Sequence, residues 1–398
     1  MKIAIISNEF PPLMSSGSVQ VRDLANDFVE LGHKVSVYTS TYGQDEGLNI
    51  DSFKNLRILR FWSLKTKEIN YFQRTINEIL TPYMMLNEIK KSSIANEKYD
   101  AVIWYSPTIF LSPVASYLKK VSECPGYLIL RDIFPDWAVD TGIIGKGLPY
   151  LILKIFEKYQ YYVADIIGVQ AKGNLGYFKR YIKKGKTKVE VLNNWLSHSG
   201  KKISSIEVSK TPLCGRKIFI YAGNMGVAQG IEILFELALN LRDRKDVGFL
   251  FVGRGSEMDR FREDPIFKSL DNVLFFDQID ADEIPSLYSQ CDVGMLSLDI
   301  RHKTHNIPGK FLSYIASGLP VLASVNPNND IINLINSSGT GQVIHDACSK
   351  NLSNKAIKII NSLGDDKIKE KCVTLSNQLF QPRIATKQIL SSINNLKR

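Results

Sequence analysis

Two stretches of this chain, far apart in the sequence, follow the same order of a short apolar strand, a loop that contains glycine, and a helix. The first consists of a strand at Lys2–Ser7, a loop at Phe10–Ser18 and a helix from about Val19 to Leu31. The second begins with a strand at Lys217–Ala222, which runs into the loop Gly223–Gly230 and another helix. A strand, a glycine loop and a helix make one half of a nucleotide-binding βαβ unit. The repetition predicts an α/β protein with two such domains in tandem.

The alternation of strands and helices continues through both halves of the chain. Residues 196–215 have no periodicity and collect Ser, Lys, Gly and Pro, which predicts a linker. We therefore expect a first domain at 1–195, a second domain at 216–380, and a last segment at 381–398 that forms a terminal helix. A cleft between facing sheet ends is the expected site. The further strand-like runs are Lys34–Thr39, Asp100–Tyr105, Gly126–Leu130, Asp165–Gln170, Lys188–Leu192, Val247–Val252, Val273–Phe276, Cys291–Leu298 and Gln342–Ile344.

The composition excludes several classes of protein. A charged fraction of 23% and a hydrophobic fraction of 44% are typical of a soluble globular protein. No apolar run is long enough to span a bilayer, and the first strand is too short for a signal peptide. The five cysteines are odd in number and lack a C-x-x-C spacing, which favours a reducing compartment and argues against a disulfide framework or a zinc site.

The net charge of +10 indicates anionic partners, but no zinc-finger spacing or RNA-binding aromatic signature is present, so nucleic-acid recognition is not expected. Residues 57–74 interleave basic and aromatic side chains, and residues 172–188 hold seven basic residues and no acid. Both segments fit docking on an anionic membrane surface. The alternative is an ordinary solvated face, since long basic side chains often cover apolar surface. Asp280 and Asp282 have a D-x-D spacing, which helix capping explains without a metal ion.

The stretch from His302 to Ser324 carries the clearest chemical signal. It reads as a polar loop, a helix that begins at Pro308–Gly309, a glycine stop at Gly318, and a short buried strand. The free N–H groups of the first helical turn, with Lys310 beside them, attract an anion such as a phosphate. An ordinary helix–strand joint with a surface lysine is the alternative.

Two positions in the first half add to this signal. Gly17 would allow a phosphate to approach the backbone near a helix start, although no complete G-x-G-x-x-G is present. Asp132 follows the strand Gly126–Leu130, at the edge where α/β sheets bind ligands. It could instead cap the turn that follows, as single acids after strands usually do.

With those residues placed, the chain resembles the retaining glycosyltransferases of family 4, which have the two-domain GT-B fold. The motifs that carry the resemblance are Phe10-Pro-Pro with Gly17, Gly32-His-Lys-Val-Ser-Val, Asn194-Trp195, Gly253-Arg-Gly255 and Ser317-Gly-Leu-Pro-Val-Leu-Ala-Ser324. At Arg131–Asp136, Gly223–Gly230 and Pro308–Lys310 the chain resembles a narrower branch of the family. That branch builds bacterial O-antigens, capsules and exopolysaccharides, often with N-acetyl-6-deoxyhexosamines such as N-acetylfucosamine.

The resemblance implies two Rossmann-like domains that face each other across a cleft, with the C-terminal helix returning to the N-terminal domain. It implies retaining transfer from a UDP-sugar, bound by the C-terminal domain, to a polyprenyl-diphosphate-linked saccharide bound by the N-terminal domain. No cofactor or metal ion is expected. The implied location is the cytoplasm, peripherally on the inner face of the plasma membrane.

The expected site residues follow from the same motifs. Lys310 would meet the diphosphate, Asp132 would face the acceptor or orient the sugar, and His305 is a further catalytic candidate. The loop around Ile279 would meet the base through its backbone, and Gly17 would close over the diphosphate. The donor-binding set is Gly17, Gly223, Asn224, Gln229, Arg254, Ile279, Pro308, Gly309 and Ser313.

The chain departs from the family pattern at four of these positions. His305 and Ser313 stand where the family usually has two glutamates, and Asn224 and Gln229 stand where it usually has an arginine and a lysine. Two alternatives therefore remain open: a sugar-nucleotide 2-epimerase of the same fold, which ordinarily needs paired carboxylates and histidines, and a catalytically silent binding partner.

Overall fold

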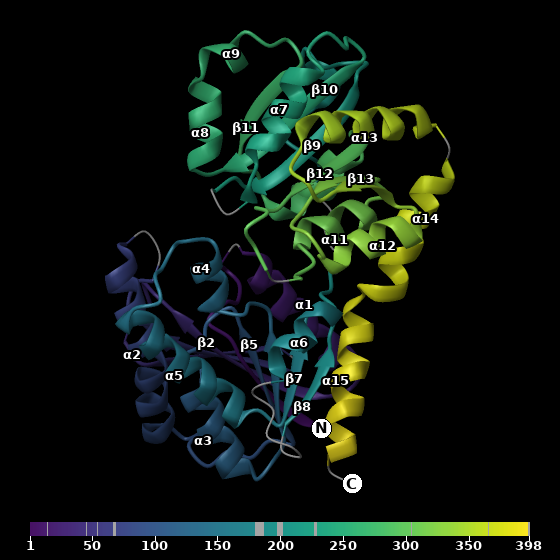
Figure 1. Cartoon of the computed structure of the whole chain (residues 1–398). Coiled ribbons are helices and arrows are strands. Elements are labelled where there is room, and N and C mark those ends of the chain that lie inside the picture. The colour runs from purple at the N-terminus through teal and green to yellow at the C-terminus, as the bar shows by residue number, and fades with distance from the viewer. Residues whose placement is uncertain are drawn as a thin grey trace. The chain divides into compact units, whose positions relative to one another are not determined.

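The computed structural model describes residues 1–396, with the exception of residues 14, 45, 54, 67–68, 180–186, 197–201, 227–228, 304 and 365. The chain forms two compact units (Figure 1). The first unit consists of Met1–Trp195 together with Pro382–Arg398, and the second consists of Leu196–Gln381. Each unit is built around one predominantly parallel sheet with helices on both faces, so the predicted fold class is confirmed.

The sheet of the first unit has eight strands in the order β3-β4-β2-β1-β5-β6-β7-β8. All neighbouring strands are parallel except β3 and β4, which form an antiparallel pair at one edge. The central strands are apolar throughout because helices cover both of their faces. The strands are β1 (Lys2–Ile6), β2 (Lys34–Thr41), β3 (Leu48–Phe53), β4 (Leu56–Trp62), β5 (Ala101–Ser106), β6 (Gly126–Leu130), β7 (Ile166–Val169) and β8 (Lys188–Val191).

Two helices, α1 (Ser16–Glu30) and α15 (Pro382–Leu396), pack on one face of this sheet through a shared apolar cluster. Arg383 of α15 forms ion pairs with Asp27 and Glu30 of α1, at 2.7 and 2.8 Å. The terminal helix therefore returns to the first unit, as predicted. The other face is covered by α2 (Tyr71–Lys91), α3 (Ser112–Ser122), α5 (Leu148–Val163) and α6 (Leu175–Phe178), and α4 (Asp136–Asp140) follows β6.

The sheet of the second unit has six parallel strands in the order β11-β10-β9-β12-β13-β14. They are β9 (Lys217–Asn224), β10 (Val247–Arg254), β11 (Val273–Asp277), β12 (Val293–Ser297), β13 (Val321–Ser324) and β14 (Gly341–Ile344). One face packs against α7 (Glu232–Asn240), α8 (Ser256–Glu263), α9 (Pro265–Lys268) and α13 (Ser349–Ser362). The other face packs against α10 (Ile284–Tyr288), α11 (Gly309–Ala316), α12 (Asp330–Ser338) and α14 (Asp366–Leu379).

Two expectations from the sequence need correction. The expected linker at 196–215 contributes Ile206, Val208 and Leu213 to the core of the second unit, so much of it is packed structure. Residues 57–62 of the expected membrane-docking segment belong to β4, with Leu59 and Phe61 fully buried.

The basic side chains of β4 are bound to acids of the same unit. Arg57 donates to Glu97 at 2.5 Å, and Arg60 donates to Asp51 at 3.1 Å. These two arginines therefore offer no unpaired charge to a membrane. Of the two aromatic residues of β4, Phe61 is fully buried in the core and Trp62 is half-buried. Of the second basic segment, 172–188, residues 180–186 lie outside the described residues.

Gly294, in β12, provides a test of how tightly the second unit is packed. A Cβ atom at this position would lie 2.3 Å from the ring of Tyr314 in α11, which is fully buried. We expect Gly294→Ala to lower the free energy of unfolding by about 1–3 kcal/mol, because the ring has no free volume into which to move. Gly176→Ala is the matched control, since no atom lies within 4 Å of its added Cβ. Equal urea midpoints for both variants would contradict the expectation.

Candidate functional site

The second unit brings three loops together where the strand order of its sheet reverses. β9 is the first strand of this sheet, and it has β10 on one side and β12 on the other. Ligands of open α/β sheets bind beyond the carboxyl ends of the strands at this switch point. The residues that follow β9, β10 and β12 are therefore the first place to look for a site.

Glycines make the close approach of β9 and β10 possible. A Cβ atom on Gly253 would lie 2.0 Å from the carbonyl oxygen of Gly223, and a Cβ atom on Gly255 would lie 2.5 Å from that of Met225. Both Gly253 (φ +155°) and Gly255 (φ +139°) also have backbone angles that other residues rarely adopt. The Gly253-Arg-Gly255 motif therefore lets the two strand ends pack backbone against backbone.

Lys310 reaches this point from α11. Its ammonium nitrogen lies 4.8 Å from the centre of the Tyr221 ring in β9, and it would be 3.2 Å from a Cβ atom on Gly223. The helix that carries it is fixed by Tyr314, one turn further on, whose hydroxyl donates to the carbonyl of Ile220 at 3.2 Å. Pro308 is the N-cap residue with no side-chain cap, and Gly309 begins the helix, as the sequence predicted.

Lys310 is unusual in having a partly buried positive charge without a counter-charge. No carboxylate of the described residues lies within ion-pair distance of its nitrogen. Burial lowers the pKa of this ammonium group to about 8, from an ordinary value near 10.5. An anion bound beside Gly223 would compensate this cost, because an opposite charge favours the protonated lysine.

The remaining donor candidates of the second unit lie around the same strand ends. Asn224 and Arg254 are register partners at the ends of β9 and β10. The Arg254 side chain is exposed and makes no hydrogen bond within the described part of the chain. Gln229 forms a backbone turn with Gly226, and the adjoining residues 227–228 lie outside the description.

Three other candidates have defined surroundings. Ser313 donates to the carbonyl of Gly309 at 3.3 Å, inside its own helix. His305 lies with its Nδ1 atom 4.0 Å from a carboxylate oxygen of Asp330. Ile279 packs on the core of the second unit, in the loop after β11. Only Lys310 among the expected catalytic residues of this unit is placed against a glycine turn.

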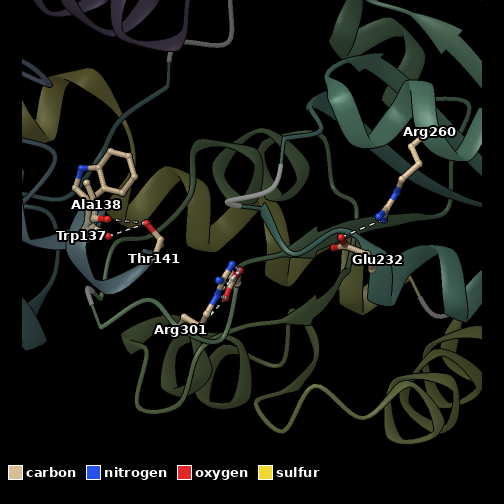
Figure 2. A network of polar contacts seen from close by, with 7 residues as sticks. Trp137, Ala138, Thr141, Glu232, Arg260 and Arg301 are labelled. Carbon is tan, nitrogen blue, oxygen red and sulfur yellow. Dashed lines mark hydrogen bonds and ion pairs between the residues drawn. The ribbon is translucent and has the colours of Figure 1, made fainter. Parts of the chain in front are cut away.

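A hollow of about 240 Å³ opens beside Gly230, between the start of α7 and the end of β12. Its polar lining includes Glu232 and Asp299, and both are bound by arginines (Figure 2). Arg260 forms an ion pair with Glu232 at 3.2 Å, and Arg301 binds Asp299 at 2.5 Å. Arg301, in the polar loop before α11, therefore has its charge matched by its neighbour.

The first unit gathers a second group of charged residues after β1 and β6. The side chain of Glu9 occupies the space above Gly17, where an added Cβ atom would lie 1.8 Å from its carboxylate oxygen. Burial raises the pKa of Asp132 to about 6, Arg131 opposes the rise, and the charge of Glu9 adds to it. Glu9 is therefore close enough to Asp132 to influence the ionisation of that carboxyl group.

Arg131, next to Asp132 in the chain, is packed against two aromatic rings. Its guanidinium lies 4.8 Å from the ring centre of Trp195 and 6.0 Å from that of Tyr105. Trp195 donates its indole N–H to the carbonyl of Gln20 at 2.8 Å, which links the Asn194-Trp195 motif to α1. The aromatic rings hold the arginine beside Asp132 while leaving Asp132 at the strand end.

The sequence interpretation missed Glu9. It directly precedes the Phe10-Pro-Pro motif and follows β1, so an acid at the carboxyl end of a central strand was the available signal. The structure also corrects the reason for Gly17, since the space above this glycine is filled by Glu9. Gly17 and Asp132 belong to the first unit and Gly223, Arg254 and Lys310 to the second, so a cleft shared by all five stays a prediction.

The D-x-D pair has a structural explanation. Asp280 accepts a hydrogen bond from the backbone N–H of Asp282 at 3.0 Å, at the start of a short 3₁₀ turn, and forms an ion pair with Lys202. Within the described ranges, no group of three side chains is arranged to hold a metal ion. None of the helices described is both long and apolar enough to cross a membrane.

Residues 216–362 match the family described as "Glycosyl transferases group 1". This segment of the second unit is similar to group 1 glycosyl transferases. The match includes the Gly223 turn, the Gly253-Arg-Gly255 motif and Lys310, and it lies wholly within the second unit.

Two curated relatives from bacteria are similar to part of the chain. WbjE of Pseudomonas aeruginosa, assigned as a glycosyltransferase, is 23% identical over 221 residues, which are 54% of each protein. WcaI of Escherichia coli K12, assigned to colanic acid biosynthesis as a glycosyl transferase, is 25% identical over 234 residues, which are 56% of each protein. The similarity thus spans about half the length of these relatives.

Two solved structures share the fold over nearly the whole length of this chain. Sucrose-phosphate synthase from Thermosynechococcus elongatus superimposes with a TM-score of 0.73 over 99% of this chain and 98% of that one, at 16% identity. HepE from Anabaena, solved in complex with UDP and glucose, has a TM-score of 0.68 over 99% and 100%, also at 16% identity. At this identity the likeness establishes the fold.

Proposed function

We propose that this protein is a retaining glycosyltransferase that moves a sugar from a UDP-sugar to a hydroxyl of a polyprenyl-diphosphate-linked saccharide. The observation that carries the proposal is the unpaired, partly buried Lys310 beside Gly223 at the switch point of a group 1 glycosyl transferase segment. A bound nucleoside diphosphate would supply the negative counter-charge that is missing beside Lys310 among the described residues.

The proposed reaction exchanges one glycosidic bond for another. The bond between the sugar and the diphosphate breaks, a bond to the acceptor oxygen forms on the same face, and the leaving diphosphate takes the acceptor proton. The task of the protein is then to position both substrates and to stabilise the developing diphosphate charge. Lys310 and the N–H groups at the start of α11 serve that purpose in the proposal.

The acceptor side is assigned to the first unit. Asp132 would accept a hydrogen bond from the acceptor hydroxyl or orient the sugar, with Glu9 as its neighbour and Arg131 holding its surroundings. No metal ion or other cofactor takes part in the proposal. The proposed transferred sugar is an N-acetyl-6-deoxyhexosamine such as N-acetylfucosamine, because the chain resembles the motifs of the narrower branch.

The bacterial relatives support a role in surface polysaccharide synthesis, since WcaI is assigned to colanic acid biosynthesis. A lipid-linked acceptor of such a pathway would place the enzyme in the cytoplasm, peripherally on the inner face of the plasma membrane. A silent binding partner is the second candidate, and the neutral residues Asn224 and Gln229 favour it.

The test is to incubate the protein with a panel of UDP-sugars, with and without polyprenyl-diphosphate-linked saccharide, and to measure UDP release and product. A transferase releases UDP only when acceptor is present. Conversion of the UDP-sugar without acceptor would identify an epimerase. Binding of UDP without turnover of any donor would identify a silent partner and overturn the proposal.

A further inference from the structure

Helix α5 of the first unit has its apolar side chains on the solvent side. Leu148, Leu151, Ile152, Ile155, Tyr159 and Tyr162 recur at helical spacing, and all six are exposed. Ile155 is 66% exposed and Tyr162 is 78% exposed. An ordinary surface helix places such residues toward the core and polar residues toward water.

Three polar side chains of α5, those of Lys154, Glu157 and Gln160, are buried instead. Lys154 and Glu157 are buried and form an ion pair with each other, and Lys154 also binds Asp136 at 3.0 Å. Tyr150 and Tyr177 donate hydroxyl groups to the same Asp136. This network, together with the buried residues Leu153, Tyr161 and Val163, holds α5 to the unit and leaves its exposed apolar face free for another contact.

Helix α2 continues this apolar surface. Ile79 of α2 and Phe156 of α5 pack against one small cluster formed by Ile109, Phe110 and Leu153. The α2 residues Ile76, Leu80 and Tyr83 flank Ile79 and are exposed, as is Phe72 at the start of the helix. Figure 1 shows α2 and α5 side by side on the same side of the sheet. Exposed apolar surface of this extent marks an interaction site.

The charge of this surface indicates which kind of partner it would bind. The exposed charged residues described in α2, α5 and the loop before α5 are all basic, namely Arg74, Lys90, Lys91, Lys146 and Lys158, and of these Arg74 is paired with Glu78 at 2.8 Å. A second copy of the chain would bring the same patch onto itself across a two-fold axis, and its lysines would repel one another. An anionic surface is complementary to them.

We infer that the exposed apolar face of α5, with the neighbouring face of α2, docks into the headgroup region of an anionic lipid membrane. At 16 residues, α5 is about 24 Å long and too short to cross the hydrocarbon core. It lies in the plane of the interface, with its leucines and isoleucines in the acyl boundary and Lys146 and Lys158 at the headgroups. This surface replaces residues 57–62 as the membrane contact, and the inference stands independently of the proposed chemistry.

The test uses vesicles of phosphatidylglycerol and phosphatidylcholine and the full-length protein in a sedimentation assay. We expect the triple variant Leu148→Glu/Leu151→Glu/Ile155→Glu to bind the vesicles at least about a hundredfold more weakly. The substitutions remove three aliphatic side chains that would insert into the membrane, and they add three negative charges of the same sign as the lipid headgroups. The matched control, Phe53→Glu/Ile203→Glu/Ile266→Glu, changes three exposed apolar residues elsewhere and should bind normally.

Two further measurements keep the inference testable. Circular dichroism should show both triple variants folded, since every substituted side chain is exposed. Lys146→Gln/Lys158→Gln should weaken binding to phosphatidylglycerol vesicles several-fold at low salt and leave the weaker binding to pure phosphatidylcholine unchanged. Equal vesicle binding by the α5 triple variant and the wild type would overturn the inference. So would sedimentation velocity showing a wild-type dimer that the α5 substitutions dissociate.

Discussion

Replacing Lys310 by alanine is expected to lower the rate of sugar transfer at least about a hundredfold while the protein stays folded. Removal of one preorganised group that stabilises charge in a transition state typically costs about 3 kcal/mol. Asn224 and Gln229 are neutral, so few positive side chains remain to oppose the charge of the leaving diphosphate. The N-terminal dipole of α11 contributes only about half a charge.

The matched control for this variant is Arg254→Ala. Arg254 is exposed at the end of β10, where it is the register partner of Asn224, and its side chain makes no hydrogen bond within the described part of the chain. Its removal should cost less if it serves the nucleotide and not the bond that breaks. Near-normal turnover by Lys310→Ala, measured with saturating donor and acceptor, would contradict the assignment and direct attention to Arg254.

Binding of UDP provides a second measurement on Lys310 that does not need turnover. With a pKa of about 8, the free ammonium group is roughly half protonated at pH 8. A diphosphate beside it favours the charged form, so UDP binding should take up as much as ~0.5 proton. Calorimetry in two buffers of different ionisation enthalpy measures this uptake, and it should be absent in Lys310→Met. A silent binding partner would show the uptake without transfer.

The central strands could be read from the sequence because they are apolar on both faces and end in glycine loops. β6 was predicted with its observed bounds, and β1, β2, β5 and β9 were predicted to within two residues. The failures were β3 and β4, at the edge of the first sheet. Two arginines interrupt the apolar pattern of β4, and the acids that bind them, Asp51 and Glu97, come from another strand and a distant turn.

The site could be predicted only where residues that are close together in the sequence form it. The start of α11 and Lys310 are neighbours in the sequence and could be predicted together. The absence, among the described residues, of a carboxylate beside Lys310 depends on the residues at all the surrounding strand ends, which the sequence alone does not bring together. Glu9 was overlooked because its meaning depends on Asp132, which lies more than a hundred residues away. The apolar outer face of α5 has the periodicity of an ordinary amphipathic helix, so only the structure shows that this face is exposed while Lys154, Glu157 and Gln160 are buried.

Asp132→Asn is expected to stabilise the protein at neutral pH and to impair transfer. The pKa of Asp132 is raised to about 6 by burial, with the charge of Glu9 adding to the rise, while the ordinary value in an unfolded chain is near 4. The folded state therefore binds the proton more tightly than the unfolded state does. The free energy of unfolding falls as the pH rises from about 4 to about 6, and above that range the whole cost is present.

An asparagine has nearly the same shape and carries no charge at any of these pH values. We expect it to raise the free energy of unfolding by roughly 2 kcal/mol at pH 7.5, less than the ~3 kcal/mol of two pKa units because Asp132 is partly open to solvent. The gain should vanish near pH 4, where the wild-type carboxyl group is also neutral. Urea unfolding at pH 4, 6 and 7.5 measures it, and Asp243→Asn, which removes an exposed carboxylate, should show no comparable change.

The same variant tests the acceptor role of Asp132. If the ionised carboxylate accepts a hydrogen bond from the acceptor hydroxyl, the wild-type rate should decline as the pH falls through about 6. Asp132→Asn should lower kcat roughly a hundredfold and lose that acidic limb, while UDP binding to the second unit stays unchanged. A variant that is more stable at pH 7.5 and fully active would show that the buried charge of Asp132 is costly without serving transfer, and the acceptor contact would then fall to Glu9.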